Sequence, residues 1–167
     1  MSPKRPDGPE ALIAPLYLVA ILLVATPAMD FATSIIPIRL GDIEWRFASV
    51  GLLSGFLLTP LLGVALAMGV AQFGGHLRFQ RILAVLNLLV TVAFAILLVF
   101  FLLDVLQLQG SVPAESKPAF ASAALKALIK HACFIVALAF LAWRGMRVSR
   151  WSSPDKRRGP ASVIVGA

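Results

Sequence analysis

The segment GLLSGFLLTPLLGVALA, residues Gly51–Ala67, contains no charged residue and places a small residue at every fourth position. Residues four apart lie one above another on a helix, so the row predicts a shallow groove along one helical face. In lipid, such grooves let two helix backbones approach closely, and this packing drives helix association. The row therefore predicts a seat for another helix, either from this chain, from another protein or from a second copy. Its positions are Gly51, Gly55, Thr59, Gly63, Ala67 and Ala71.

The composition of the 167-residue chain is typical of a membrane protein. Hydrophobic residues make up 59% of it and charged residues 14%, and its mean hydropathy is +0.90. Soluble domains have about 25% charged residues. The net charge of +7 would suit nucleic acid, but the basic residues lie at the ends of apolar segments and form no stripe with aromatic residues. We therefore expect membrane lipids and other transmembrane helices as partners, and no nucleic acid.

Four apolar blocks alternate with short polar connections. They are expected to be helices, because lipid leaves the backbone of an isolated strand without hydrogen-bond partners, and about 20 helical residues cross the hydrocarbon core. The sequence thus predicts an all-α integral membrane protein with a four-transmembrane-helix bundle in residues 11–148. A cytoplasmic segment (1–10) precedes it, and a basic cytoplasmic tail (149–167) follows it. Pro27 and Pro60 predict bends in the first two helices. The helices are expected at about 11–36, 47–73, 82–108 and 118–146.

The distribution of basic residues predicts the orientation. The fourth block contains Lys126 and Lys130, so its first half would alternatively lie along the membrane surface. Three spans, however, would export the basic tail, whereas Lys and Arg favour the cytoplasmic side. Four spans with both termini inside place most basic residues in the cytoplasm, and the composition suggests a bacterial inner membrane. The cytoplasmic residues are Lys4, Arg5, Arg78, Arg81, Arg144, Arg147, Arg150, Lys156, Arg157 and Arg158, against Arg39, Arg46 and Lys117 outside.

Two Trp–Arg pairs mark the predicted membrane boundaries. Trp45 and Arg46 begin the second helix on the outer side, and Trp143 and Arg144 end the fourth on the inner side. Amphipathic rings and long basic side chains are favoured at headgroup level. We therefore interpret both pairs as interface anchors.

Five ionisable residues fall in the outer part of the predicted bundle, where charges are costly. Side-chain directions suggest that the Asp104 carboxylate meets the Lys126 ammonium between the third and fourth helices. Such a pair would fix the packing of the two helices; alternatively, the cluster is a site for a proton, an anion or an acidic headgroup. The five are Asp30, Asp104, Lys126, Lys130 and His131.

No sequence motif indicates catalysis. The chain contains no phosphate loop, nucleophile elbow, dinucleotide fingerprint or metal-ligand spacing, and its single cysteine excludes an internal disulfide. We expect no enzymatic activity, cofactor or metal. The predicted function is that of an accessory or scaffolding subunit acting through helix packing, in a homo-oligomer or a larger membrane complex. The alternative is a small transporter or channel component that uses the charged cluster.

Overall fold

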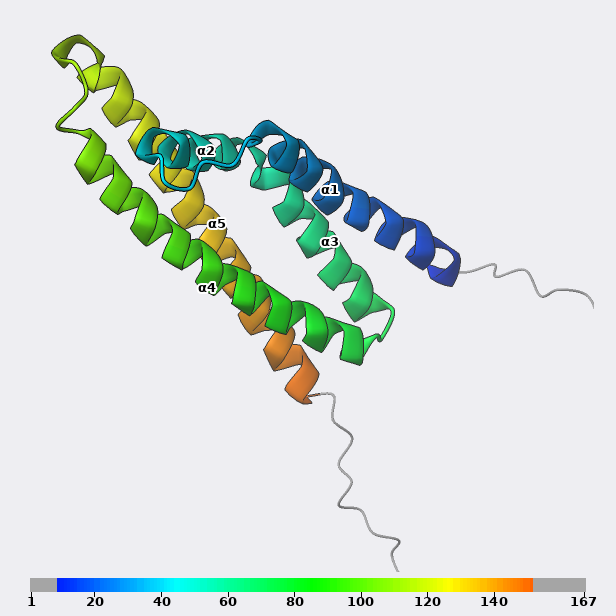
Figure 1. Cartoon of the computed structure of the whole chain (residues 1–167). Coiled ribbons are helices and arrows are strands. Elements are labelled where there is room, and N and C mark those ends of the chain that lie inside the picture. The colour runs from blue at the N-terminus through cyan, green and yellow to red at the C-terminus, as the bar shows by residue number, and fades with distance from the viewer. Residues whose placement is uncertain (1–8, 152–167) are drawn as a thin grey trace, which may run out of the picture.

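The computed structural model describes residues 9–151, with side-chain surroundings for residues 11–147. Within this part of the chain the regular structure is entirely helical (Figure 1). Most of the predicted tail (149–167) and most of the N-terminal segment lie outside the described residues, and the first three residues of the predicted tail continue the last helix. The elements are η1 (Pro9–Leu12), α1 (Ile13–Ser34), α2 (Ile43–Phe56), α3 (Leu58–Phe73), α4 (Leu77–Leu108), η2 (Ala114–Ser116) and α5 (Lys117–Trp151).

Three of these helices are long and apolar enough to cross a membrane, and a fourth span is possible. The three are α1, α4 and the helical segment containing α5. The helices α2 and α3 satisfy the same criteria only together, and they are bent by 47° at the break between them. The fold is therefore all-helical with three or four candidate spans, and the side on which each terminus lies stays a prediction.

The predicted second helix, 47–73, is in fact two helices. The break falls at Leu57, three residues before Pro60, where the sequence predicted only a bend. A proline cannot donate to the carbonyl four residues earlier, and its ring clashes with that group, so the disruption falls on its N-terminal side. Pro27, in contrast, is buried within the continuous helix α1.

The start of α2 also differs from the prediction of residue 47. The Asp42 side chain accepts hydrogen bonds from the backbone N–H groups of Glu44 (2.9 Å) and Trp45 (3.3 Å). This N-cap satisfies donors that a helix start otherwise leaves free, and Glu44 adds a favourable charge in the first turn. The apolar pattern alone missed this polar first turn.

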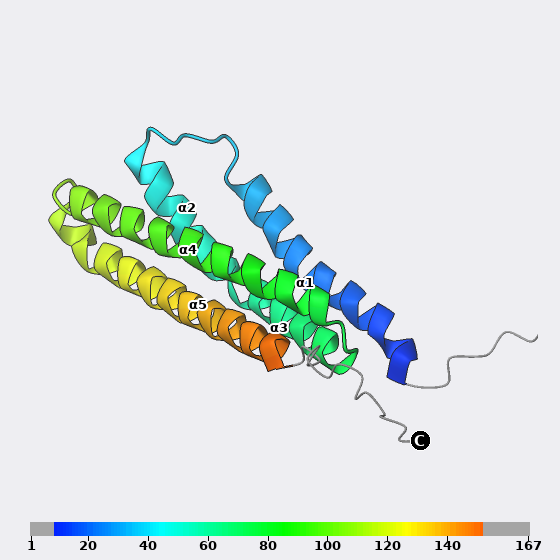
Figure 2. The same cartoon turned by 90° about the horizontal axis from the view of Figure 1, so that it is seen from below.

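The helices pack as two pairs. The antiparallel helices α4 and α5 lie side by side along most of their length, and α1 lies against α3 on the other side of the molecule (Figures 1 and 2). The helix α2 contacts both α4 and α5. The ring of Phe47 on α2 stacks with Phe101 of α4 (5.4 Å between centroids) and Phe120 of α5 (4.8 Å). Aromatic packing thus joins α2 to the α4–α5 hairpin.

A close approach at the other end of the molecule joins α5 to α3 and α4. A Cβ atom at Gly145 would lie 2.6 Å from Met68 Cε and 2.9 Å from Ala84 Cβ. Only glycine therefore fits this crossing without a shift of its neighbours. The sequence analysis did not identify Gly145, because it has no regularly spaced small neighbours.

Candidate functional site

The second half of the small-residue row (Gly63, Ala67 and Ala71), predicted to be the inner half, packs within the chain. A Cβ atom at Gly63 would lie 2.8 Å from the Ala20 carbonyl oxygen and 2.9 Å from Leu23 Cβ, so α1 rests directly on the α3 backbone. Ala71 is fully buried and Ala67 is half-buried. This half of the row is a seat for another helix of the same chain.

The first half of the row (Gly51, Gly55 and Thr59), predicted to be the outer half, has no helix packed on it in the described part of the chain. No atom lies within 4 Å of a Cβ built at Gly51 or Gly55, and Gly55 and Thr59 are exposed. The change from packed to open follows the break at Leu57, where α2 turns away from the direction of α3. The row is therefore two surfaces, one used by α1 and one unused by the described part of the chain.

The outer ends of α2 and α4 are joined by an ion pair. The Arg46 guanidinium donates from Nη2 to Asp104 Oδ1 (2.6 Å) and from Nε to Oδ2 (3.0 Å). Its Nη1 also donates to the Leu40 carbonyl oxygen at 2.8 Å. The Asp104 side chain is 7% exposed and that of Arg46 is 33% exposed. The predicted pairing of Asp104 with Lys126 is wrong, because the Asp104 carboxylate pairs with Arg46, which was predicted only as an interface anchor.

The other predicted members of the polar cluster do not come together around Asp104. Asp30, Lys126 and Lys130 are exposed on the surfaces of α1 and α5. No hydrogen bond or ion pair joins any two of the five predicted residues. The five residues therefore do not form one cluster in the described part of the chain.

His131 is the one member of that set buried in the α4–α5 packing. Its Nδ1 donates to the Ala127 carbonyl oxygen at 2.9 Å, since a carbonyl can only accept. The ring lies between Phe94 (6.0 Å) and Phe101 (6.4 Å), and Nε2 is buried without a partner. The neutral ring fits this aromatic surrounding as a packing residue, because a second N–H would have no acceptor.

The aromatic anchors have different partners at the two ends. Trp45 is half-buried and lines a cavity of about 250 Å³ beside the Arg46–Asp104 pair. Trp143 is 48% exposed, and the Arg147 guanidinium lies 4.7 Å from its ring centroid, in a cation–π contact. Arg144 is exposed. Arg147 is therefore the arginine that contacts the ring of Trp143.

Asn87 and Thr91, four positions apart on α4, have different hydrogen-bond partners. The Asn87 amide donates from α4 to the Met68 sulfur of α3 at 3.2 Å. The Thr91 hydroxyl instead donates to the Asn87 carbonyl oxygen within α4, at 2.7 Å. Asn87 thus supplies the polar contact between these two helices.

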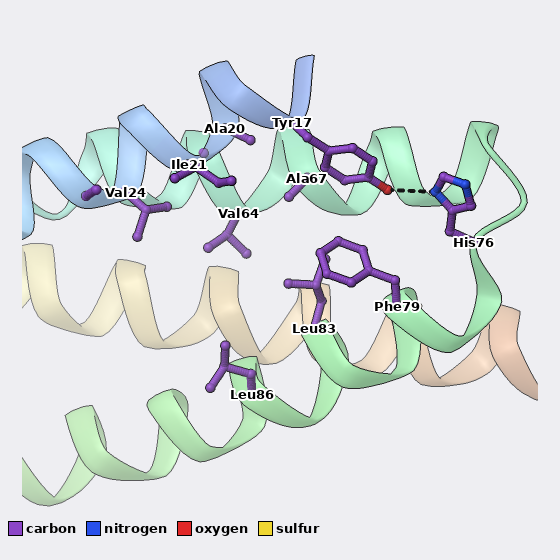
Figure 3. A pocket seen from close by; sticks show the side chains of 12 residues that line it. Tyr17, Ala20, Ile21, Val24, Val64, Ala67, His76, Phe79, Leu83 and Leu86 are labelled. Carbon is purple, nitrogen blue, oxygen red and sulfur yellow. Dashed lines mark hydrogen bonds between the residues drawn. The ribbon is translucent and has the colours of Figure 1, made fainter. Parts of the chain in front are cut away.

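An apolar cleft of about 580 Å³ separates α1 and α3 from α4 (Figure 3). Among the described residues that line it, the polar side chains are Tyr17 and His76, whose Oη and Nδ1 atoms share a hydrogen bond of 3.1 Å at one end. Phe79 meets Tyr17 edge to face there, with 5.4 Å between centroids. The remaining lining residues are Ala20, Ile21, Val24, Ala25, Gly63, Val64, Ala67, Leu83 and Leu86.

The cleft was not predictable from the sequence. The hydrogen bond joins residues 59 positions apart, and no local pattern indicates that contact. Ala67, predicted as part of the packing row, is half-buried and lines the cleft together with Gly63.

Comparison of the chain with protein-family models, with curated proteins and with solved structures finds no match.

Proposed function

We propose that this chain is a non-enzymatic accessory or scaffolding subunit of a membrane assembly, which binds other transmembrane helices through the outer half of its small-residue row. The observation that carries the proposal is the open backbone at Gly51 and Gly55, where a side chain would meet no atom within 4 Å. The same row already seats a helix at Gly63. The open half thus has the chemistry of a helix seat but has no helix on it.

The effect of small residues on helix association depends on the lipid solvent. Lipid tails are as apolar as leucine, so two helices gain little by covering large apolar side chains. They gain where small residues bring backbones together and dispersion contacts accumulate. Around Gly51 and Gly55 the neighbouring α2 residues Leu52 and Leu53 are apolar, and the exposed side chain of Leu52 suits contact with another apolar helix.

For the arrangement in the membrane we propose four spans, with the bent pair α2–α3 as one of them, and both termini in the cytoplasm of a bacterial cell. The excess of Lys and Arg on one side supports this orientation. Helix lengths support a position of the Arg46–Asp104 pair near the outer boundary. Counted from Arg81, about 20 residues of α4 cross the core and end near Phe101, three residues before Asp104.

The substitution Gly55→Leu, alone or with Gly51→Leu, tests the proposed function. The added side chain has room in the isolated chain, so we expect unchanged thermal stability after purification. The leucine side chain would occupy the surface on which a partner helix packs, so the partner should be lost. The complex extracted in a mild detergent such as digitonin should therefore shift to a smaller size on a native gel.

Gly69→Leu is the matched control. A Cβ at Gly69 also meets nothing within 4 Å, but this glycine lies two positions away from Ala67, outside the row. The control should keep the wild-type complex. A double variant at Gly51 and Gly55 that runs at the wild-type size would contradict the proposed function.

A further inference from the structure

We propose that the cleft between α1, α3 and α4 binds one acyl chain of an acidic phospholipid from the cytoplasmic leaflet, with the phosphate at the N-terminus of α4. This inference goes beyond the helix-packing function and rests on the orientation proposed above. It combines the shape of the cleft, its length along the bundle and the charge at its polar end.

The shape of the cleft suits a flexible apolar chain. Its volume of about 580 Å³ lies within the range of about 300–1,000 Å³ found for small-molecule sites. Several of its lining side chains are exposed on the surface of the bundle, namely Ile21, Val24, Phe79 and Leu86 (Figure 3). A lipid tail can therefore reach the cleft from the side of the bundle.

The length of the cleft is close to the thickness of the hydrocarbon region of one leaflet. Its lining on α1 runs from Tyr17 to Ala25, eight residues that rise about 12 Å. Half of the hydrocarbon core is about 15 Å. With the N-terminus of α1 in the cytoplasm, the cleft begins at the inner boundary and ends near the middle of the bilayer.

The same geometry disfavours a helix as the occupant. A transmembrane helix from a partner would have to pass both ends of the cleft to cross the bilayer. At the cytoplasmic end, the contacts of Tyr17 with His76 and Phe79 bridge α1 and α4. An acyl chain meets no such obstacle, because it ends in a headgroup at that level.

The polar end of the cleft is suited to an anion. His76 lines the cleft and is also the N-cap residue of α4, where backbone N–H groups and the helix dipole favour negative charge. The exposed Arg78 lies in the first turn. Among residues 11–147, whose side-chain surroundings the structure describes, no carboxylate lines the cleft or lies in that turn, so none of these residues offers an acidic partner to an ammonium or choline group. This balance of charge selects an acidic headgroup over a zwitterionic one.

Native mass spectrometry of the full-length protein tests this inference, with palmitoyl-oleoyl phosphatidylglycerol and phosphatidylcholine as probes in a non-ionic detergent. We expect the wild type to retain the phosphatidylglycerol adduct preferentially. Ala67→Phe places a ring in the cleft and should abolish the adduct, whereas Ala95→Phe, at an exposed position of α4 outside the cleft, should keep it.

The headgroup end is tested separately by Arg78→Gln, an exposed position whose substitution leaves the packing intact. Loss of one cationic side chain near the phosphate should weaken phosphatidylglycerol binding about fivefold. Arg39→Gln, an exposed arginine in the connection between α1 and α2, should leave binding unchanged. Equal retention of the two lipids by the wild type, or an unchanged affinity in Arg78→Gln, would overturn the proposal.

The orientation is checked by labelling Arg78→Cys in a Cys133→Ser background with a membrane-impermeant maleimide. Protection in intact cells and labelling after lysis support a cytoplasmic headgroup site; labelling in intact cells would overturn the leaflet assignment. The native-gel size of the Gly55→Leu complex is a separate measurement, so failure of lipid binding and failure of the packing function are distinguishable.

Discussion

Gly63→Leu is expected to detach α1 from α3 and to lower the free energy of unfolding by about 3 kcal/mol, the upper end for overpacked sites. The reason is that the new Cβ would lie 2.8 Å from a backbone atom, the Ala20 carbonyl oxygen. A backbone group cannot rotate away as a side chain does, so the whole of α1 must shift. That shift would also open the cleft wall that Ala20 shares with Ala67.

Reversible unfolding in mixed micelles of dodecyl maltoside and SDS measures the loss, with Gly69→Leu as the control. Leucine is a better helix former than glycine by about 1 kcal/mol, so the control should be unchanged or slightly more stable. Gly63→Ala should lose less than Gly63→Leu, because it adds the clash but no further bulk. Equal stability of the Gly63 and Gly69 variants would contradict the direct seating of α1 on α3.

The all-helical fold was predictable because a chain with such long apolar blocks meets one strong constraint if it lies in lipid. Long uncharged blocks must form helices that satisfy their own backbone groups, and the predicted ranges 82–108 and 118–146 lie within α4 (Leu77–Leu108) and α5 (Lys117–Trp151). The ends differ because both helices continue past the apolar pattern into polar turns. Hydropathy predicts which residues face lipid, and it does not predict where the backbone stops being helical.

The partner of Asp104 was predicted incorrectly, although part of the necessary signal is present in α5. The buried positions of this helix repeat every three or four residues, and the two lysines fall outside that stripe, so Lys126 is directed away from α4. The helical face on which Lys126 lies, considered together with its depth, excludes Lys126 as the partner of Asp104. The stripe comprises Ala124, Ala127, His131, Phe134, Leu138, Ala142 and Gly145.

Arg46 itself was not predictable as the partner. It lies 58 positions from Asp104, in a helix whose start depends on the Asp42 cap and whose direction depends on the break at Leu57. The same applies to the small-residue row: its spacing predicts a helix seat, but only the break determines that Gly63 is occupied and Gly55 is open. Spacing along one helix carries no information about the angle between two.

Arg46→Ala is expected to destabilise the protein more than Asp104→Ala, although the two substitutions break the same ion pair. The reason is the unequal exposure of the partners. In the intact pair the Asp104 side chain is 7% exposed and that of Arg46 33% exposed. Removing Arg46 therefore leaves a carboxylate at a largely buried position with no cation, and an uncompensated buried charge of this kind costs about 3 kcal/mol. Without Asp104, the guanidinium of Arg46 keeps its bond to the Leu40 carbonyl oxygen and can extend toward water.

Because the loss in Arg46→Ala comes from a stranded charge, removing that charge should restore stability. The double variant Arg46→Ala/Asp104→Ala is therefore expected to unfold at a higher SDS fraction than Arg46→Ala alone, a non-additivity that a double-mutant cycle measures directly. Arg39→Ala, at an exposed arginine two residues beyond Pro37, is the control and should change stability by no more than about 0.5 kcal/mol. If the double variant were less stable than either single one, the two side chains would contribute independently, and the ion pair would not be what joins the outer ends of α2 and α4.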